Sequence, residues 1–133
     1  MWNTMNAESL RDYCLSLKGV TDKMAFTNAT TEYDRNLLAF YVKDKWFCFF
    51  NVDEFDFCTI KCDPEESKIL QEKYEEITPG YHMNKKHWIS VHFNKNVPDK
   101  VIKGLLKKSY QLVVASLIKT ERDDLKEDTD KRE

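Results

Sequence analysis

Residues 37–52 read LLAFYVKDKWFCFFNV and carry the strongest fold signal in the chain. Two runs rich in aromatic and β-branched residues, 37–42 and 46–52, flank the polar turn Lys43-Asp44-Lys45. Such side chains pack well on a pleated surface, so two runs joined by a short polar turn predict an antiparallel hairpin. Residues 55–62 alternate in the same way and predict a third strand, which makes the hairpin a meander.

Three helices are predicted around this meander. The first begins after the N-cap Asn6, ends at Gly19, and has apolar side chains at helical spacing: Leu10, Tyr13, Cys14 and Leu17. The second begins at Asp63-Pro64, where an aspartate N-cap precedes a proline suited to the first helical position, and runs to about residue 75. The third begins at Pro98, extends to about residue 119, and has a predicted buried stripe: Ile102, Leu105, Leu106, Ser109, Leu112, Val113 and Leu117.

The remaining segments complete the predicted order. Residues 20–36 are weakly patterned and are expected to be irregular, with one short strand near 24–27 that would make the meander four-stranded. Residues 88–93 predict a further strand with Trp88, Ser90 and His92 on one face. The order helix, meander, helix, strand, helix predicts an α+β two-layer domain, an antiparallel sheet with helices packed on one face. We expect one domain over residues 1–120 and a charged, disordered tail over 121–133.

Composition excludes several classes of protein. The chain has 133 residues, of which 41% are apolar and 13% aromatic, so most of it is expected to fold. A net charge of −2 gives no global attraction to nucleic acid, and no apolar run approaches the ~20 residues of a membrane span. The beginning of the chain lacks the pattern of a signal peptide, so we expect a cytoplasmic protein that does not engage membranes. The four cysteines form no CxxC pair and are expected to be reduced core residues: Cys14, Cys48, Cys58 and Cys62.

The candidate functional segment is residues 79–88, PGYHMNKKHW. His82, His87 and His92 are five residues apart, a spacing that places them on one face of neither a helix nor a strand, so no metal site is expected. His82 or His87 could act as a general base, but no nucleophile elbow, paired carboxylates or glycine-rich phosphate loop accompanies them. We therefore expect a non-enzymatic protein without a cofactor.

Positive charge is concentrated in and after this segment. Residues 82–110 contain seven lysines and the single acid Asp99, a net charge of +6 in 29 residues. Lysines interleaved with histidines and aromatics suit contacts to nucleic-acid phosphates and bases, and the candidate contacts are Lys85, Lys86, His87, Lys100, Lys103 and Lys107. Alternatively, these lysines are simply solvated. The segment itself could be a hydrogen-bonded structural corner, formed by Tyr81, His82, Asn84 and Trp88.

Five short motifs resemble the MmcQ/YjbR family of small bacterial proteins: LRDYCLSL at 10–17, KCDPE at 61–65, TPGYHMNKKHW at 78–88, VPD at 97–99 and SYQLV at 109–113. The resemblance implies a frataxin-like (CyaY-like) α+β fold with a double-wing arrangement, and a DNA-binding label that is common in that family. This sequence departs from the family pattern at Lys18, where proline is usual, at 23–26, and in the turn 43–45, which lacks the usual glycine. Frataxin-type iron binding is not expected, because the first helix offers only Glu8 and Asp12.

Three functional hypotheses follow. The leading one is a cytoplasmic DNA-binding protein that contacts phosphates through a basic loop and helix. The second is a protein-interaction module with an anionic partner, and the third is an enzyme acting on a small anionic substrate. A continuous positive surface that joins Lys85 and Lys86 to Lys100, Lys103 and Lys107 would favour the first.

Overall fold

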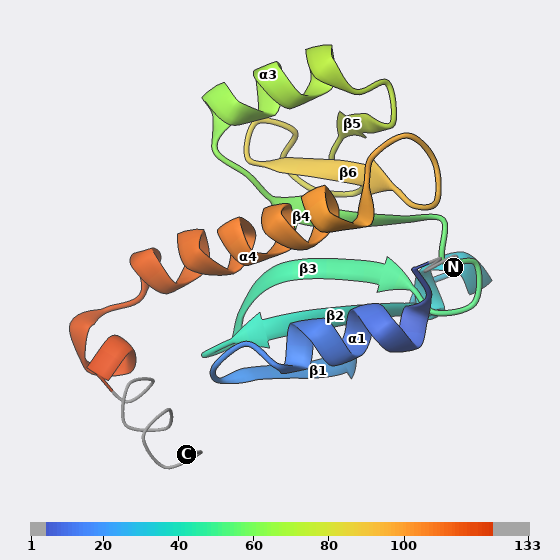
Figure 1. The fold of residues 1–133 in the computed structure, drawn as a ribbon. Helices are drawn as coiled ribbons and strands as arrows, with labels where there is room; N and C mark the ends of the chain where they lie inside the picture. Colours follow the sequence, from blue (N-terminus) through green and yellow to red (C-terminus); the bar gives the residue numbers. More distant parts are fainter. Residues whose placement is uncertain (1–4, 124–133) are drawn as a thin grey trace.

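The computed structural model describes residues 5–123, which form an antiparallel six-stranded sheet in the order β1-β2-β3-β4-β6-β5 (Figure 1). The strands are β1 (Val20–Met24), β2 (Leu37–Val42), β3 (Lys45–Asn51), β4 (Phe57–Lys61), β5 (Ile77–Pro79) and β6 (Trp88–His92). The helices are α1 (Ala7–Leu15), α2 (Glu32–Arg35), α3 (Pro64–Lys73) and α4 (Asp99–Ser116). The predicted α+β class with an antiparallel sheet is confirmed.

The central hairpin is tighter than predicted. Its turn has two residues rather than three, because Lys45 already pairs with Val42 as the first residue of β3. Lys43 and Asp44 have φ values of 49° and 66°, the left-handed pair of a turn whose twist matches that of the strands. The hairpin therefore forms without the glycine that usually relieves this conformation.

The first strand was misplaced by the sequence prediction, and two short elements were missed. The strand expected near 24–27 is instead β1 at Val20–Met24, where only Val20 is buried and no alternation is visible. An edge strand with one buried side chain gives little pattern to detect. The four-residue helix α2 and the three-residue strand β5 were likewise not predicted, since neither is long enough to show a period.

Helices α1 and α4 cover one face of the sheet, and α3 adds Leu70 to the same core beside β5 (Figure 1). Asn6 caps α1 through a reciprocal capping box with Ser9. The buried stripe predicted for α4 is present except at Leu112, which is 37% exposed. All four cysteines are buried free thiols.

The opposite face of the sheet is covered by loops instead of a long helix. Buried side chains of β2 and β3 form a second cluster there, namely Leu37, Ala39, Tyr41 and Phe49. Residues of the β1–β2 connection and of the β5–β6 loop pack against this cluster: Ala25, Phe26 and Tyr33 from the former, Tyr81 and Met83 from the latter. The candidate segment therefore lies on the face that α4 does not cover.

The C-terminal end of α4 differs from the prediction. The helix ends at Ser116, and a separate helical turn covers residues 119–123, where the Arg122 guanidinium donates to the Leu117 carbonyl at 2.6 Å. Residues 124–133 of the predicted tail lie outside the described part of the chain, so their disorder stays a prediction. Among residues 5–123 there is no helix with the length and apolar character needed to span a bilayer.

Candidate functional site

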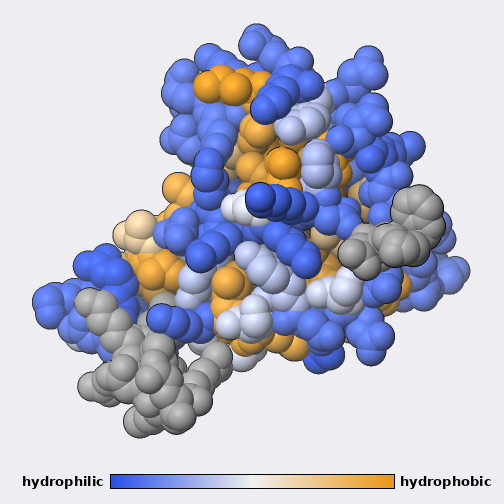
Figure 2. Space-filling view, viewed as in Figure 1, coloured by the Kyte–Doolittle hydropathy of each residue, from blue (hydrophilic) through white to orange (hydrophobic). Residues whose placement is uncertain are grey.

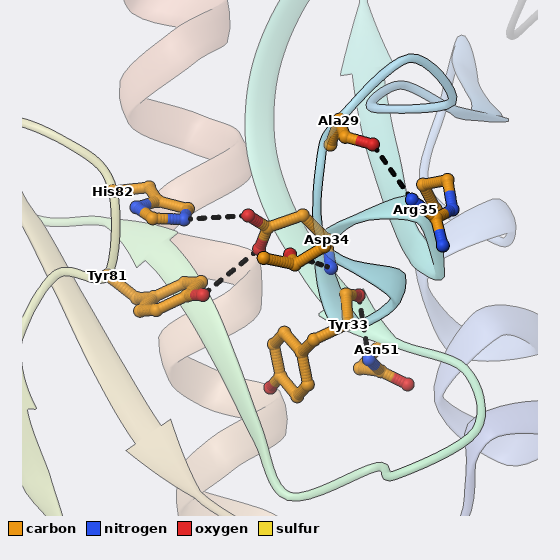
Figure 3. Close-up of polar contacts among 8 residues, drawn as sticks. Ala29, Tyr33, Asp34, Arg35, Asn51, Tyr81 and His82 are labelled. Carbon is orange, nitrogen blue, oxygen red and sulfur yellow. Dashed lines mark hydrogen bonds and ion pairs between the residues drawn. The ribbon is translucent and has the colours of Figure 1, made fainter.

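The β5–β6 loop, residues 80–87, folds over the face of the sheet opposite α4, which we call the second face, and meets α2 (Figure 3). Asp34 of α2 accepts a hydrogen bond from the Tyr81 hydroxyl on Oδ1, at 3.0 Å. Its Oδ2 lies 3.1 Å from Nε2 of His82, whose backbone has a positive φ of 60°. The Asp34 carboxylate thus joins α2 to the β5–β6 loop, whose Tyr81 and His82 lie 47 and 48 residues further along the sequence.

A second carboxylate holds the neighbouring tyrosine in place. The Tyr33 hydroxyl lies 2.8 and 2.9 Å from the two carboxylate oxygens of Asp56, and its ring makes an edge-on contact with that of Tyr81. The buried Asn51 amide donates to the Tyr33 carbonyl at 3.0 Å, which fixes the backbone of α2 (Figure 3). Both tyrosines are therefore held as donors to acidic partners.

The electrostatics of this corner match its geometry. Burial, and then the hydrogen bond to a carboxylate, raise the pKa of Tyr33 and of Tyr81. Burial alone would raise the pKa of Asp34, but hydrogen bonds from His82, Tyr81 and Thr31 outweigh it and lower that pKa. Asp34 is consequently an ionised acceptor and the tyrosines are protonated donors at neutral pH.

The other residues predicted for the structural corner are placed as follows. Trp88 is 8% exposed, so its ring is not available to stack on a base. Asn84 organises the tip of the loop, because its Oδ1 accepts from the Lys86 amide at 2.8 Å and its carbonyl accepts from the His87 amide. The His87 side chain is exposed, and its carbonyl accepts from the Cys62 amide at 2.8 Å.

Six lysines lie at one end of the sheet, which we call the basic end. The strand register places there the end of β2, the beginning of β3, the end of β4 and the beginning of β6. The turns and strand ends at this end carry Lys18, Lys43, Lys45, Lys61, Lys85 and Lys86. With the two acids Asp44 and Asp63 the net charge of these segments is +4.

The opposite end of the sheet is acidic. It comprises α2, the β3–β4 turn, the α3–β5 turn and the loop 93–98, and its acids are Glu32, Asp34, Asp53, Glu54, Asp56, Glu75 and Glu76. Against these seven acids stand Arg35 and Lys95, which leaves a net charge of −5. The sheet therefore separates charge along its strands.

The predicted lysines of α4 do not all join the basic end. α4 begins at the acidic end, after β6, and runs toward the basic end, where Ser109 contacts Phe47 and Lys61. Lys100 is in the first turn of α4, about 13 Å from Ser109 along the helix axis, and therefore lies away from the basic end. The Lys103 ammonium lies over the ring of Tyr13, 5.7 Å from its centroid. Lys107, two residues before Ser109, is the member of this set placed toward the basic end, on the helix-covered face.

Sequence reasoning missed four members of the basic end: Lys18, Lys43, Lys45 and Lys61. The signal that could have found them is the register of the predicted hairpin, which brings its own turn lysines beside the ends of the neighbouring strands. The ammonium groups of Lys43, Lys45 and Lys86 make no ion pair with any other residue of the described range. The Lys85 ammonium is less free, because it donates to the Gly80 carbonyl at 2.9 Å.

A hollow of about 250 Å³ lies between the beginning of α3 and the middle of α4. Figure 2 shows hydrophobic side chains at the surface between these helices, and the hollow is lined by Asp63, Glu66, Lys108, Gln111, Leu112 and Ala115. Its lysine is already paired, since the Lys108 ammonium lies 2.7 Å from Glu66. No three His, Cys, Asp or Glu side chains between residues 5 and 123 are grouped so that they could hold a metal ion. We therefore take the basic end as the candidate site.

A family model described as YjbR matches residues 15–112. The chain belongs to the YjbR family. Similar curated proteins are the uncharacterized proteins YbdF of Escherichia coli O157:H7, 42% identical over 66 residues, and YyaQ of Bacillus subtilis, 42% identical over 59 residues. These matches cover 50% and 44% of this chain and 54% and 49% of the relatives, so the chain spans about half the length of the curated relatives it matches.

Solved structures extend the YjbR match to the fold. Protein DR2400 of Deinococcus radiodurans, a DUF419-domain protein, has a TM-score of 0.78 and 28% identity, with 92% of this chain and 88% of that chain covered. A protein from Pseudomonas syringae has a TM-score of 0.64 and 29% identity, with 81% and 98% covered. The two-layer α+β fold is thus shared with these neighbours, and their names state no ligand.

Proposed function

We propose that this YjbR-family protein is a non-enzymatic DNA-binding protein whose basic end contacts the phosphate backbone. The observation that carries the proposal is the convergence of six lysines from four separate segments at one end of the sheet. A duplex presents a closely spaced row of negative charges, and a cluster of unpaired ammonium groups at the protein surface suits that pattern. The cytoplasmic location expected from the sequence is part of this proposal.

The individual lysines are expected to contribute unequally. Lys43, Lys45 and Lys86 have unpaired ammonium groups among the described residues and are the strongest candidates for phosphate contacts. Lys85 shapes the loop through its bond to Gly80, and His87 is exposed beside it. The helix lysines Lys100 and Lys103 are given a minor role, while Lys107 supports the basic end from the helix-covered face.

The test is the salt dependence of binding to a fluorescent duplex, followed by anisotropy. Each phosphate contact releases counterions, so the slope of log K against log salt falls by about 0.9 for each lysine removed. Replacing Lys43, Lys45 and Lys86 together by alanine should therefore weaken binding at low salt and reduce the slope by about 2.7. The matched control replaces three exposed lysines outside the basic end by alanine, so that it loses the same three charges: Lys68, Lys95 and Lys119. Both triple variants carry the same net charge, so only a local effect can separate them.

Two outcomes would contradict the proposal. Wild-type protein that binds neither duplex nor single-stranded DNA at ~50 mM salt would end it. Equal loss of affinity in the basic-end variant and the control would show that net charge, not the basic end, governs binding. If DNA fails but an acidic protein is retained through the same three lysines, the interaction-module hypothesis takes its place.

A further inference from the structure

We propose that Asp34, an acidic residue, strengthens DNA binding because it positions the loop that carries Lys85, Lys86 and His87. This inference rests on the proposed function and identifies a residue that positions part of that site. Asp34 itself makes no contact with the DNA. It acts through its contacts to Tyr81 and His82 (Figure 3).

Asp34 is itself rigidly placed. Its backbone amide donates to the Thr31 hydroxyl at the N-cap of α2, and the Arg35 guanidinium donates to the carbonyls of Ala29 and Thr30. The buried Asn51 amide holds the Tyr33 carbonyl from the sheet side. The Asp34 side chain is only 16% exposed, so water competes little for its two occupied oxygens.

The loop depends on Asp34 because the other polar side-chain contacts of residues 82–86 are made within the loop itself. Between residues 82 and 86 they are the Asn84 turn and the bond from Lys85 to Gly80, which shape the loop without attaching it to the sheet. Met83 adds an apolar contact to the second cluster. The backbone of His82 lies in the left-handed region, which is uncommon for a residue other than glycine and which tertiary contacts help to retain. The contact of its ring with Asp34, at 3.1 Å, joins His82 to a different element and favours this conformation.

The sign of the expected effect separates this inference from simple electrostatics. Removing a carboxylate makes the protein less negative, which on charge alone strengthens DNA binding. If Asp34 positions the loop, its removal weakens binding instead, because the lysines lose their fixed placement and ordering them costs entropy. Weaker DNA binding after removal of a negative charge is a result that an acidic residue without a positioning role would not give.

The experiment compares Asp34→Ala, Asp34→Asn and Tyr81→Phe with the control Glu54→Ala, an exposed acid at the same end of the sheet. We expect Asp34→Ala to bind duplex DNA about tenfold more weakly, the effect of losing a hydrogen bond to a charged group. Asp34→Asn keeps an acceptor for Tyr81 and should recover part of the loss. Tyr81→Phe should weaken binding without any change of net charge. Glu54→Ala should bind as well as wild type or better.

A second readout measures the loop without DNA. Trypsin cleaves after lysine in mobile segments, so mass spectrometry can follow the first cleavage after Lys85 or Lys86 under native conditions. We expect this cleavage to be about tenfold faster in Asp34→Ala than in wild type or Glu54→Ala. Thermal melts of each variant establish that the fold is retained.

The outcomes distinguish the inference from the proposed function. If wild type does not bind DNA, the proposed function fails, and unchanged cleavage after Lys85 and Lys86 in Asp34→Ala would overturn the positioning role separately. If wild type binds DNA and Asp34→Ala binds equally well or more tightly, Asp34 does not position the site and this inference is wrong.

Discussion

The hydroxyl of Ser109 on α4 joins the helix layer to the sheet at a point where strand pairing stops. At the basic end, the last pair between β3 and β4 is Cys48 with Ile60. The residue before Cys48, Phe47, has no partner in β2 either, because the strand pairing has a bulge there. Beyond them, Ser109 Oγ donates to the Phe47 carbonyl at 2.7 Å and accepts from the Lys61 amide at 2.9 Å. The side chain is fully buried.

Replacing Ser109 by alanine should therefore be costly despite the small change in volume. Two backbone groups lose their partner, and each buried unsatisfied group costs about 1–3 kcal/mol. Deleting one oxygen leaves almost no cavity, and alanine is the better helix former, which returns a few tenths of a kcal/mol. We expect a net loss of about 2–4 kcal/mol in the free energy of unfolding, or a fall of roughly 8–15 °C in Tm.

The measurement is urea unfolding of Ser109→Ala beside Ser116→Ala. Ser116 is in the last turn of the same helix, is exposed, and donates to the Val113 carbonyl at 2.7 Å. The control makes the same chemical change where water can replace the lost partner, so it should differ from wild type by less than about 0.5 kcal/mol. A Ser109→Ala protein within 0.5 kcal/mol of wild type would refute the bridging role.

Two further predictions concern the second face of the sheet. A Cβ at Gly80 would lie 2.6 Å from the Trp88 Cβ and 2.8 Å from the Trp88 carbonyl. Gly80→Ala must therefore push β5 from β6 and should lower the free energy of unfolding, measured in urea, by about 1–3 kcal/mol. The control Gly104→Ala, which has open space on α4, should raise it by about 0.5–1 kcal/mol. If both substitutions behave alike, the close approach of Gly80 to Trp88 is not a constraint. The pKa of Asp34 is lowered because its hydrogen bonds, led by that from His82, outweigh burial. Their contribution is therefore complete above the ordinary pKa of 3.8 and is lost as pH falls through the lowered value, so wild type should lose more stability than Asp34→Asn below about pH 4. Parallel acid-unfolding curves for the two proteins would contradict this.

The central hairpin and the helices α1, α3 and α4 could be predicted because their signals are local. Asn6 caps α1 and Asp63 caps α3 through backbone amides only two or three residues away. The strands β1 and β5 could not be predicted in the same way, since an edge strand with one buried residue shows no alternation. Their places are set by pairing with β2 and β6, which is a tertiary effect.

The candidate site was less accessible to sequence reasoning than the fold. Asp34 meets His82 across 48 residues, and nothing near Asp34 in the sequence indicates that contact. The run of seven lysines after residue 82 was visible, but α4 spreads its lysines along the length of the sheet. The lysines that do converge belong to turns far apart in the chain, and only the strand register brings them together.

The same register explains how a chain of net charge −2 can present a basic surface. β3 has seven residues, so the basic and acidic ends are separated by roughly 20 Å along the strands. The Debye length is about 10 Å at 0.1 M salt, which means that a phosphate bound at one end is largely screened from the charges at the other. Asp34 is the exception, because it contacts the β5–β6 loop that carries Lys85 and Lys86. The other six acids of the acidic end, against Arg35 and Lys95, leave four excess negative charges, which cancel little of the attraction exerted by the four excess positive charges of the basic end. Apart from the contacts of Asp34 with the loop, the charges of each end interact with their surroundings nearly independently, and the net charge of the whole chain is a poor guide to what the basic end can bind.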